Sequence, residues 1–217
     1  IVAGGIVDIR NYPDQREYKD NLKQNIIPEN YAVSEIDRSI KFNHRPGIVW
    51  LTGLSGSGKS TIAKNVEKRL FQKNINVFSL DGDNLRLGLN KNLDFSPEDR
   101  TENIRRTAEV ANLFTRAGFI VLVSLISPYR SERKKARDIR PEIFREIYIE
   151  ASLEVCSKRD VKGLYAKAMK GEIKNFTGIS SPYEPPEMPN LVINTSKSSI
   201  DESVEKLEKF ILKEFSF

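Results

Sequence analysis

The string GLSGSGKST at residues 53–61 has the residue types and spacing of a loop that binds nucleotide phosphates. It fits the pattern G-x-x-x-x-G-K-S/T, in which backbone N–H groups of small residues surround a polyphosphate. Lys59 can reach the β- and γ-phosphates, and the Ser60 hydroxyl can bind Mg²⁺. The alternative is a glycine- and serine-rich turn that contains a lysine by chance, but the apolar run IVWLT before it and the helix expected after it disfavour this. The nucleotide-binding residues predicted here are Gly53, Leu54, Ser55, Gly56, Ser57, Gly58, Lys59, Ser60 and Thr61.

Two carboxylates in the string DGDNLR, Asp81 and Asp83, follow the next apolar run at residues 77–80. At the end of a strand, such carboxylates can organise Mg²⁺ and accept the proton of an attacking hydroxyl. Arg86, a few residues on, can bind a second anion. The alternative is an ordinary turn capped by an aspartate, because Asp and Asn are frequent helix caps. A phosphate loop in the same sheet favours a phosphoryl-transfer site.

The string FSPEDRTENIRR at residues 95–106 is expected to start a long helix with Ser96 as its N-cap. Arg100 and Asn103 are three residues apart, so they lie on the same side of such a helix. An arginine and an amide that point into a cleft can hold a phosphate, a sulfate or the edge of a purine, and Phe95 can stack on a base. The alternative is a solvated helix face, with Phe95 as a hydrophobic staple.

Two further segments are candidates for the site because of where they lie in the chain. Ser127, in the string SPYR, comes just after the apolar run at 119–125, and loops at the ends of central strands often meet ligands. A turn or N-cap serine at this position is the alternative. The proline-rich segment at 181–189 cannot form regular structure, and we expect a loop that could act as a lid.

Strands and helices alternate from residue 47 onward, which predicts an α/β fold with a parallel sheet covered on both faces. With a phosphate loop after the first strand, this is a three-layer sandwich of the P-loop NTPase type, with the ligand at the carboxyl ends of the strands. Residues 46–217 are expected to form this P-loop domain, and residues 1–45 an extension or linker. The strands are predicted at 48–52, 77–80, 119–125, 146–150 and 191–194. The helices are predicted at 59–74, 96–118, 131–139, 153–159, 164–170 and 200–215.

The composition limits the partners and the compartment. The chain has 217 residues and a net charge of +5, which suits an anionic small molecule. Because its Lys and Arg residues are interleaved with acids, we expect no nucleic-acid partner, and no apolar run approaches the ~18 residues of a membrane span. The single cysteine, Cys156, excludes an internal disulfide, fits a reducing compartment and is expected to be buried. His44, the single histidine, is expected to be a solvated linker residue.

Six strings resemble, in this order, the adenylylsulfate kinase (APS kinase) family: LTGLSGSGKST, LDGDNLRLGLN, FSPEDRTENIRR, SLISPYRSER, CSKRDVKGLYAKAMKGEIKNFTGI and SPYEPP. The second and fifth strings are far more specific than the phosphate loop, which many enzymes share. Members of this family transfer the γ-phosphoryl group of ATP to the 3′-hydroxyl of adenosine 5′-phosphosulfate (APS), which gives 3′-phosphoadenylyl sulfate. The resemblance therefore implies this reaction, with ATP and Mg²⁺.

The resemblance also implies roles for individual residues. Asp81 and Asp83 would lie near the metal and the 3′-hydroxyl, with Asp83 favoured as the proton acceptor, and Ser60 and Asp81 would be the metal ligands. The serine that matches Ser127 is described in the family as a phosphoserine intermediate, whereas in-line transfer between two bound nucleotides needs positioning and charge neutralisation, not a covalent relay. Arg86, Arg100 and Asn103 would hold APS, Phe95 and Phe176 would enclose its adenine, and Arg159 and Lys162 would contact the base and phosphates of ATP.

The amino-terminal string IVAGGIVDIR is similar to the tail of the sulfate adenylyltransferase subunit in bacterial bifunctional proteins. A fused or associated sulfate adenylyltransferase is therefore expected. A homodimer is expected because the family usually forms dimers, and a cytoplasmic location fits the single cysteine. Two other functions stay open on the residues alone. A gluconate or nucleotide kinase would not need the phenylalanine of NFTGI, and a non-enzymatic nucleotide-binding regulator would be expected to lose Lys59 or the aspartate pair.

Overall fold

A five-stranded parallel sheet forms the centre of the computed structural model, which describes residues 27, 29, 31–160 and 162–217. The strands lie in the order β2-β3-β1-β4-β5, and each neighbouring pair is parallel. This confirms the predicted fold class and all five predicted strands. Their bounds are β1 (Gly47–Thr52), β2 (Val77–Asp81), β3 (Ile120–Ser124), β4 (Phe144–Glu150) and β5 (Leu191–Asn194).

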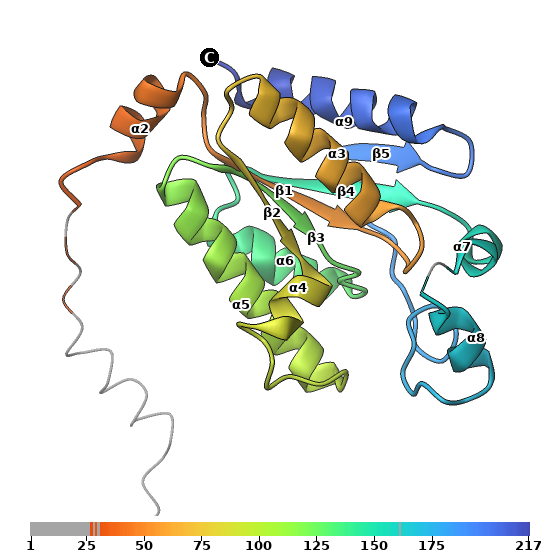
Figure 1. The fold of residues 1–217 in the computed structure, drawn as a ribbon. Helices are drawn as coiled ribbons and strands as arrows, with labels where there is room; N and C mark the ends of the chain where they lie inside the picture. Colours follow the sequence, from red (N-terminus) through yellow and green to blue (C-terminus); the bar gives the residue numbers. More distant parts are fainter. Residues whose placement is uncertain (1–26, 28, 30, 161) are drawn as a thin grey trace, which may run out of the picture. The chain divides into compact units, whose positions relative to one another are not determined.

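Helices cover both faces of this sheet and give three layers (Figure 1). On one face α3 (Lys59–Gln72) and α9 (Ile200–Phe215) pack on a buried cluster that includes Leu51. On the other face α5 (Pro97–Arg116) and α6 (Arg130–Ile139) cover a second cluster around Trp50. Because β1 and β3 are buried along their whole length, their apolar runs are continuous, as is typical of central parallel strands. Every helix in the described part of the chain is too short or too polar to cross a membrane.

Short helices follow the carboxyl ends of the strands and surround the phosphate loop (residues 53–61). α4 (Gly82–Leu87) follows β2, and α7 (Leu153–Arg159) and α8 (Leu164–Met169) follow β4. A third apolar cluster joins α7 to α8, and it contains Cys156, which is buried as expected. A Cβ atom on Gly56 would come within 3.0 Å of the Cys156 carbonyl oxygen, so the phosphate loop lies directly against α7.

Serine residues cap three helices that border the site. The side chains of Ser96, Ser152 and Ser199 each accept a hydrogen bond from the backbone N–H three positions on. Such a bond satisfies one of the free N–H groups of the first turn, and the cap predicted for Ser96 is thereby confirmed. After α5 the chain turns at Gly118, whose φ of +91° is strained for any other residue type.

Like the short helix α4, helix α2 (Glu35–Phe42) was not predicted, and it lies inside the expected extension. It belongs to the compact unit of Glu35–Phe217, and an ion pair of 3.0 Å joins Glu35 to Arg140 after α6. This compact unit includes residues before 46, the position at which the P-loop domain was expected to begin. Residues 1–26 of the expected extension lie outside the described residues.

His44 is buried, so the expectation of a solvated linker residue was wrong. It is only 3% exposed, and its Nε2 accepts a hydrogen bond of 3.1 Å from the Asn76 N–H. Because Nε2 accepts, the proton of the neutral ring is on Nδ1, which donates to the Arg45 carbonyl at 3.2 Å. Burial lowers the pKa of His44, with the bond to Arg45 acting in the opposite direction. The histidine thus fixes the entry into β1 against the entry into β2.

We expect the buried His44 to make stability depend on pH. Its pKa is lowered in the folded chain, so the unfolded chain binds more protons, and the contribution is fully present above the ordinary value of 6.5 and is lost as the pH falls below it. Urea unfolding is measured at about pH 7.5 and at about pH 5.5. The urea concentration at the unfolding midpoint should decrease less between these pH values in His44→Gln than in the parent chain. Equal losses in the two proteins would contradict this.

Candidate active site

The phosphate loop joins β1 to α3 and has the geometry of an anion-binding turn. Gly56 and Gly58 have φ values of +74° and +101°, so glycine is needed at both positions. Lys59 is buried, and its Nζ donates to the carbonyl oxygens of Gly53 and Leu54 at 2.9 and 2.7 Å. Burial lowers the pKa of Lys59 to about 8. A negatively charged ligand beside this amine would favour its protonated form.

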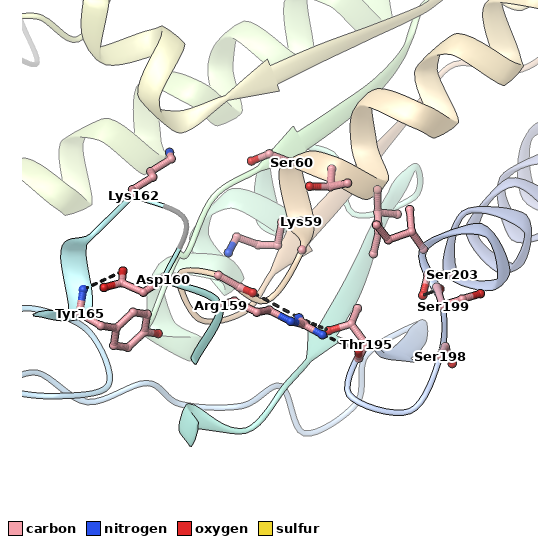
Figure 2. A pocket seen from close by; sticks show the side chains of 15 residues that line it. Lys59, Ser60, Arg159, Asp160, Lys162, Tyr165, Thr195, Ser198, Ser199 and Ser203 are labelled. Carbon is pink, nitrogen blue, oxygen red and sulfur yellow. Dashed lines mark hydrogen bonds between the residues drawn. The ribbon is translucent and has the colours of Figure 1, made fainter. Parts of the chain in front are cut away.

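A pocket of about 390 Å³ opens beside this loop (Figure 2). Its walls come from the phosphate loop and the start of α3, from the end of α7 with the turn that follows, and from the segment between β5 and α9. Arg159 and Lys162, both predicted to contact ATP, line this pocket together with Lys59. The pocket thus brings together residues from three distant parts of the chain.

Ser60 and Asp81, the predicted metal ligands, lie in direct contact. The Ser60 hydroxyl donates to Asp81 Oδ2 at 2.7 Å, and Ser124 Oγ lies 3.3 Å from the Ser60 hydroxyl. A hydroxyl and a carboxylate are oxygen donors of the kind that Mg²⁺ prefers, with substrate phosphates completing the shell. Asp81 also caps α4, because its Oδ1 accepts from the Asp83 N–H at 3.1 Å. The cap and the metal interpretation are therefore compatible in geometry.

Asp83, the favoured proton acceptor, forms an ion pair with Lys162 from the turn between α7 and α8. Both side chains are more than half exposed, so the pair contributes little to stability. Lys162 also lines the nucleotide pocket, and it therefore links the predicted base to the predicted phosphate site.

Arg86 and Arg100, predicted for the acceptor, are close enough to repel each other. Burial and then the charge of Arg100 lower the pKa of Arg86, and burial lowers that of Arg100. Arg86 donates to the carbonyls of Leu93 and Asp94, and its guanidinium lies 4.4 Å from the Phe95 ring centroid. Within the part of the chain that the structure describes, neither arginine forms an ion pair. The charges of Asp83, Asp99 and Asp94 offset part of this lowering of the Arg86 pKa. Two half-buried cations that no described carboxylate pairs with still favour an anionic ligand.

The arginine at position 100 joins the two predicted adenine-binding segments. Its Nε donates to the Phe95 carbonyl at 3.0 Å, while Nη1 donates to Thr177 Oγ1 and Nη2 to the Asn175 carbonyl. Phe95 is 54% exposed, whereas Phe176 is 8% exposed and packs edge-on against Tyr165. A base can therefore stack on the exposed ring of Phe95. A base could stack on Phe176 only if that ring turned out of its apolar cluster.

The amide of Asn103 and the hydroxyl of Ser127 are buried. Asn103 Oδ1 accepts a bond of 2.7 Å from Asn90 Nδ2. Ser127 has a φ of +40°, and its Oγ accepts from the Trp50 indole at 3.0 Å. Arg133 donates to the Ser127 carbonyl at 2.7 Å. The contacts of Ser127 are those of a residue that shapes the turn after β3, the alternative noted from the sequence.

The segment at 181–189 is anchored along its length, which argues against the lid considered from the sequence. Arg130 donates to the carboxylate of Glu184 and to the Pro185 carbonyl, both at 2.8 Å. Arg133, which is ion-paired with Glu146 at 2.6 Å, donates to the Glu184 carbonyl. These bonds tie the segment to the start of α6.

Two residues that support the phosphate loop were not predicted. Tyr165 Oη donates to the Ser55 carbonyl at 2.9 Å, and Thr195 Oγ1 donates to the Ser57 carbonyl at 2.8 Å. Thr195 follows directly after β5, at the sheet edge where ligands bind, so its position was a usable signal. Tyr165 lies in a short helix whose sequence carries no such sign.

Comparisons with known proteins agree with this geometry. A family model described as adenylylsulphate kinase matches residues 45–194. An adenylyl-sulfate kinase of Acaryochloris marina is 52% identical over 188 residues, which is 86% of this chain and 92% of the relative. One of Oceanobacillus iheyensis is 50% identical over 192 residues, or 88% of this chain and 96% of the relative.

Solved structures give the same result. The Mycobacterium tuberculosis APS kinase in complex with AMPPNP and APS is 47% identical, with a TM-score of 0.75 over 78% of this chain and 98% of that chain. A hexameric APS kinase from Thiobacillus denitrificans is 29% identical, with a TM-score of 0.58 over 91% of this chain and 36% of that longer one. A gluconokinase from Sinorhizobium meliloti, 18% identical with a TM-score of 0.53, shares the fold alone. The chain belongs to the adenylylsulphate kinase family.

Proposed function

We propose that this chain transfers the γ-phosphoryl group of ATP to the 3′-hydroxyl of APS, with ADP and 3′-phosphoadenylyl sulfate as products. The observation that carries the choice of acceptor is that Arg86 and Arg100, which form no ion pair among the described residues, lie beside the exposed ring of Phe95. An acceptor with a phosphate, a sulfate and a purine matches two cations and an aromatic face. A sugar acid would leave the ring without a base to stack on.

The nucleotide half of the proposal uses the pocket of Figure 2. Residues 53–61 surround the phosphates of ATP with backbone N–H groups, and Lys59 leaves its carbonyl partners in the loop to bind the β- and γ-phosphates. Arg159, which lines the same pocket, contacts the base and the phosphates of ATP. In the transfer, the 3′-oxygen attacks the γ-phosphorus while the bond to the bridging oxygen of ADP breaks.

Asp83 is assigned as the group that accepts the proton of the 3′-hydroxyl. Its carboxylate must be free for this, so Lys162 releases Asp83 when the substrates bind, and the ammonium then faces phosphate oxygens instead. When Lys162 exchanges the Asp83 carboxylate for phosphate oxygens, the free energy changes little, because its ion pair with Asp83 is exposed to solvent. Ser60 and Asp81 would hold Mg²⁺, which supplies charge neutralisation on the phosphates.

The remaining parts of the proposal come from the resemblance. Ser127 is the exception, because its contacts with Trp50 and Arg133, not the resemblance, support a role in shaping the turn beside the site. Asn103 and Phe176 complete the APS site. A homodimer and an association with sulfate adenylyltransferase are proposed on the resemblance too, and a cytoplasmic location on the single cysteine. Residues 35–217 are the proposed kinase domain.

The proposed function is tested by mixing the protein with ATP, Mg²⁺ and APS and by separating the nucleotides. The expected result is formation of 3′-phosphoadenylyl sulfate and ADP in equal amounts. Parallel reactions contain gluconate or adenosine monophosphate as the acceptor. Turnover with either of these and none with APS would contradict the proposal.

A further inference from the structure

Thr195 occupies a fixed position between the sheet and the phosphate loop. It follows β5 directly, and its N–H donates to the Glu150 carbonyl at 2.9 Å, which continues the pairing of β5 with β4. Its side chain points to the loop, because a Cβ atom on Gly58 would lie 3.7 Å from the Thr195 methyl group. The sheet therefore sets where the hydroxyl and the methyl of this residue lie.

The hydroxyl of Thr195 has a defined hydrogen-bond direction. Arg159 can only donate, so Thr195 Oγ1 accepts from Arg159 Nη1 at 3.1 Å and gives its own proton to the Ser57 carbonyl at 2.8 Å, in preference to the Glu150 carbonyl at 3.4 Å. The carbonyl and the N–H of a trans peptide point in opposite directions. When the Ser57 carbonyl points toward Thr195, the Gly58 N–H of the same peptide group points away from Thr195. The bond therefore fixes the direction of one of the N–H groups that are proposed to bind phosphate.

The guanidinium of Arg159 is held by the same residue. Nη1 donates to the Thr195 hydroxyl, Nη2 donates to the Thr195 carbonyl at 2.7 Å, and Nη1 also reaches the Gly56 carbonyl at 3.3 Å (Figure 2). This fork, in which Nη1 and Nη2 both donate to Thr195, needs the planar guanidinium of arginine. Among the residues described, Arg159 has no ion-pair partner, so its charge stays available to a ligand in the pocket.

We propose that Thr195 is a positioning residue for the nucleotide, because its hydroxyl joins Arg159 and the phosphate loop into one binding unit. This inference rests on the proposed function only in that the pocket takes a nucleoside triphosphate. Loss of the hydroxyl leaves the Ser57 carbonyl without its partner and frees the guanidinium to move. Nucleotide affinity should fall, whereas the binding of the phosphoryl acceptor should change little.

The test measures equilibrium binding of AMPPNP with Mg²⁺ by calorimetry, without any acceptor, so that it stands apart from the assay of product formation. Thr195→Val keeps the shape and removes the hydroxyl, and we expect Kd to rise at least ~10-fold. Thr195→Ser keeps the hydroxyl and should stay within ~3-fold of the parent. Thr115→Val removes a buried hydroxyl that donates to the Asn112 carbonyl in α5, and it should leave Kd unchanged.

Two further variants separate positioning from a general loss of structure. Arg159→Lys keeps the charge but cannot form the fork, and this exposed substitution should raise Kd at least ~5-fold even if Thr195→Val does not fold. The effects of Thr195→Val and Arg159→Lys should be clearly less than additive in the double variant. An unchanged Kd in Thr195→Val or in Arg159→Lys, or full additivity, would overturn the proposal. Tight AMPPNP binding without turnover of APS would contradict the proposed function and leave this inference standing.

Discussion

Replacement of Asp83 by asparagine is expected to lower turnover by at least ~10²-fold, because an amide cannot accept the proton of the 3′-hydroxyl. ATP binding should stay nearly unchanged, since among the described residues no hydrogen bond joins Asp83 to residues 53–61, and its ion pair with Lys162 is expected to open when ATP binds. The fold should also be retained, because the lost ion pair with Lys162 is exposed on both sides. The measurement is kcat for APS phosphorylation together with the Kd for AMPPNP. Near-normal kcat in Asp83→Asn would refute the assignment.

Two matched variants separate the base from other uses of a carboxylate. Asp138→Asn removes an exposed ion pair with Lys134 in α6, and it should leave kcat unchanged. Asp81→Asn removes the partner of the Ser60 hydroxyl, so its main effect should be a higher Mg²⁺ concentration for half-maximal activity. If Asp81→Asn and Asp83→Asn showed the same Mg²⁺ dependence, the division of roles between them would be wrong.

The sheet and the phosphate loop could be predicted because their signals are local. β1 and β3 are buried on both faces, so their sequences are continuous apolar runs that stand out against polar neighbours. The cap at Ser96 is a contact between residues three apart. The phosphate loop combines glycine, a lysine and a hydroxyl at fixed spacing, and each has its own physical reason.

Features that depend on distant contacts were missed or left open. His44 is buried against a segment 32 residues away, where the Asn76 N–H donates a hydrogen bond to its ring. No local sequence pattern contains that contact. Ser127 could be read from the sequence as a ligand-contacting residue or as a turn residue, and the hydrogen-bond partner of its hydroxyl distinguishes the two. That partner is Trp50, 77 residues away in the chain. The helix α2 has only eight residues, and its apolar Ile36 and Ile40 are exposed, so a contact with distant Arg140 rather than a buried apolar face holds it in place.

Replacement of Arg100 by methionine should raise the KM for APS by ~10²-fold, because it removes both a cation and the bonds that join the Phe95 and Asn175 segments. The Kd for AMPPNP should change less than ~3-fold, since Arg100 does not line the nucleotide pocket. Arg100→Lys, which keeps the charge without the planar fork, should fall between the parent and the methionine variant. Initial rates over a range of APS concentrations provide the measurement.

The same helix offers a matched control for this prediction. Arg105 is also on α5, but its guanidinium binds the Glu102 carboxylate at 2.7 Å, and its side chain is 57% exposed. Its charge is therefore already compensated, and Arg105→Met should leave the KM for APS unchanged. The two variants remove the same group from one helix and differ in whether that group forms an ion pair with a carboxylate among the described residues. Equal effects would mean that the missing carboxylate at Arg100 does not mark a binding site, and the choice of an anionic acceptor would lose its physical basis.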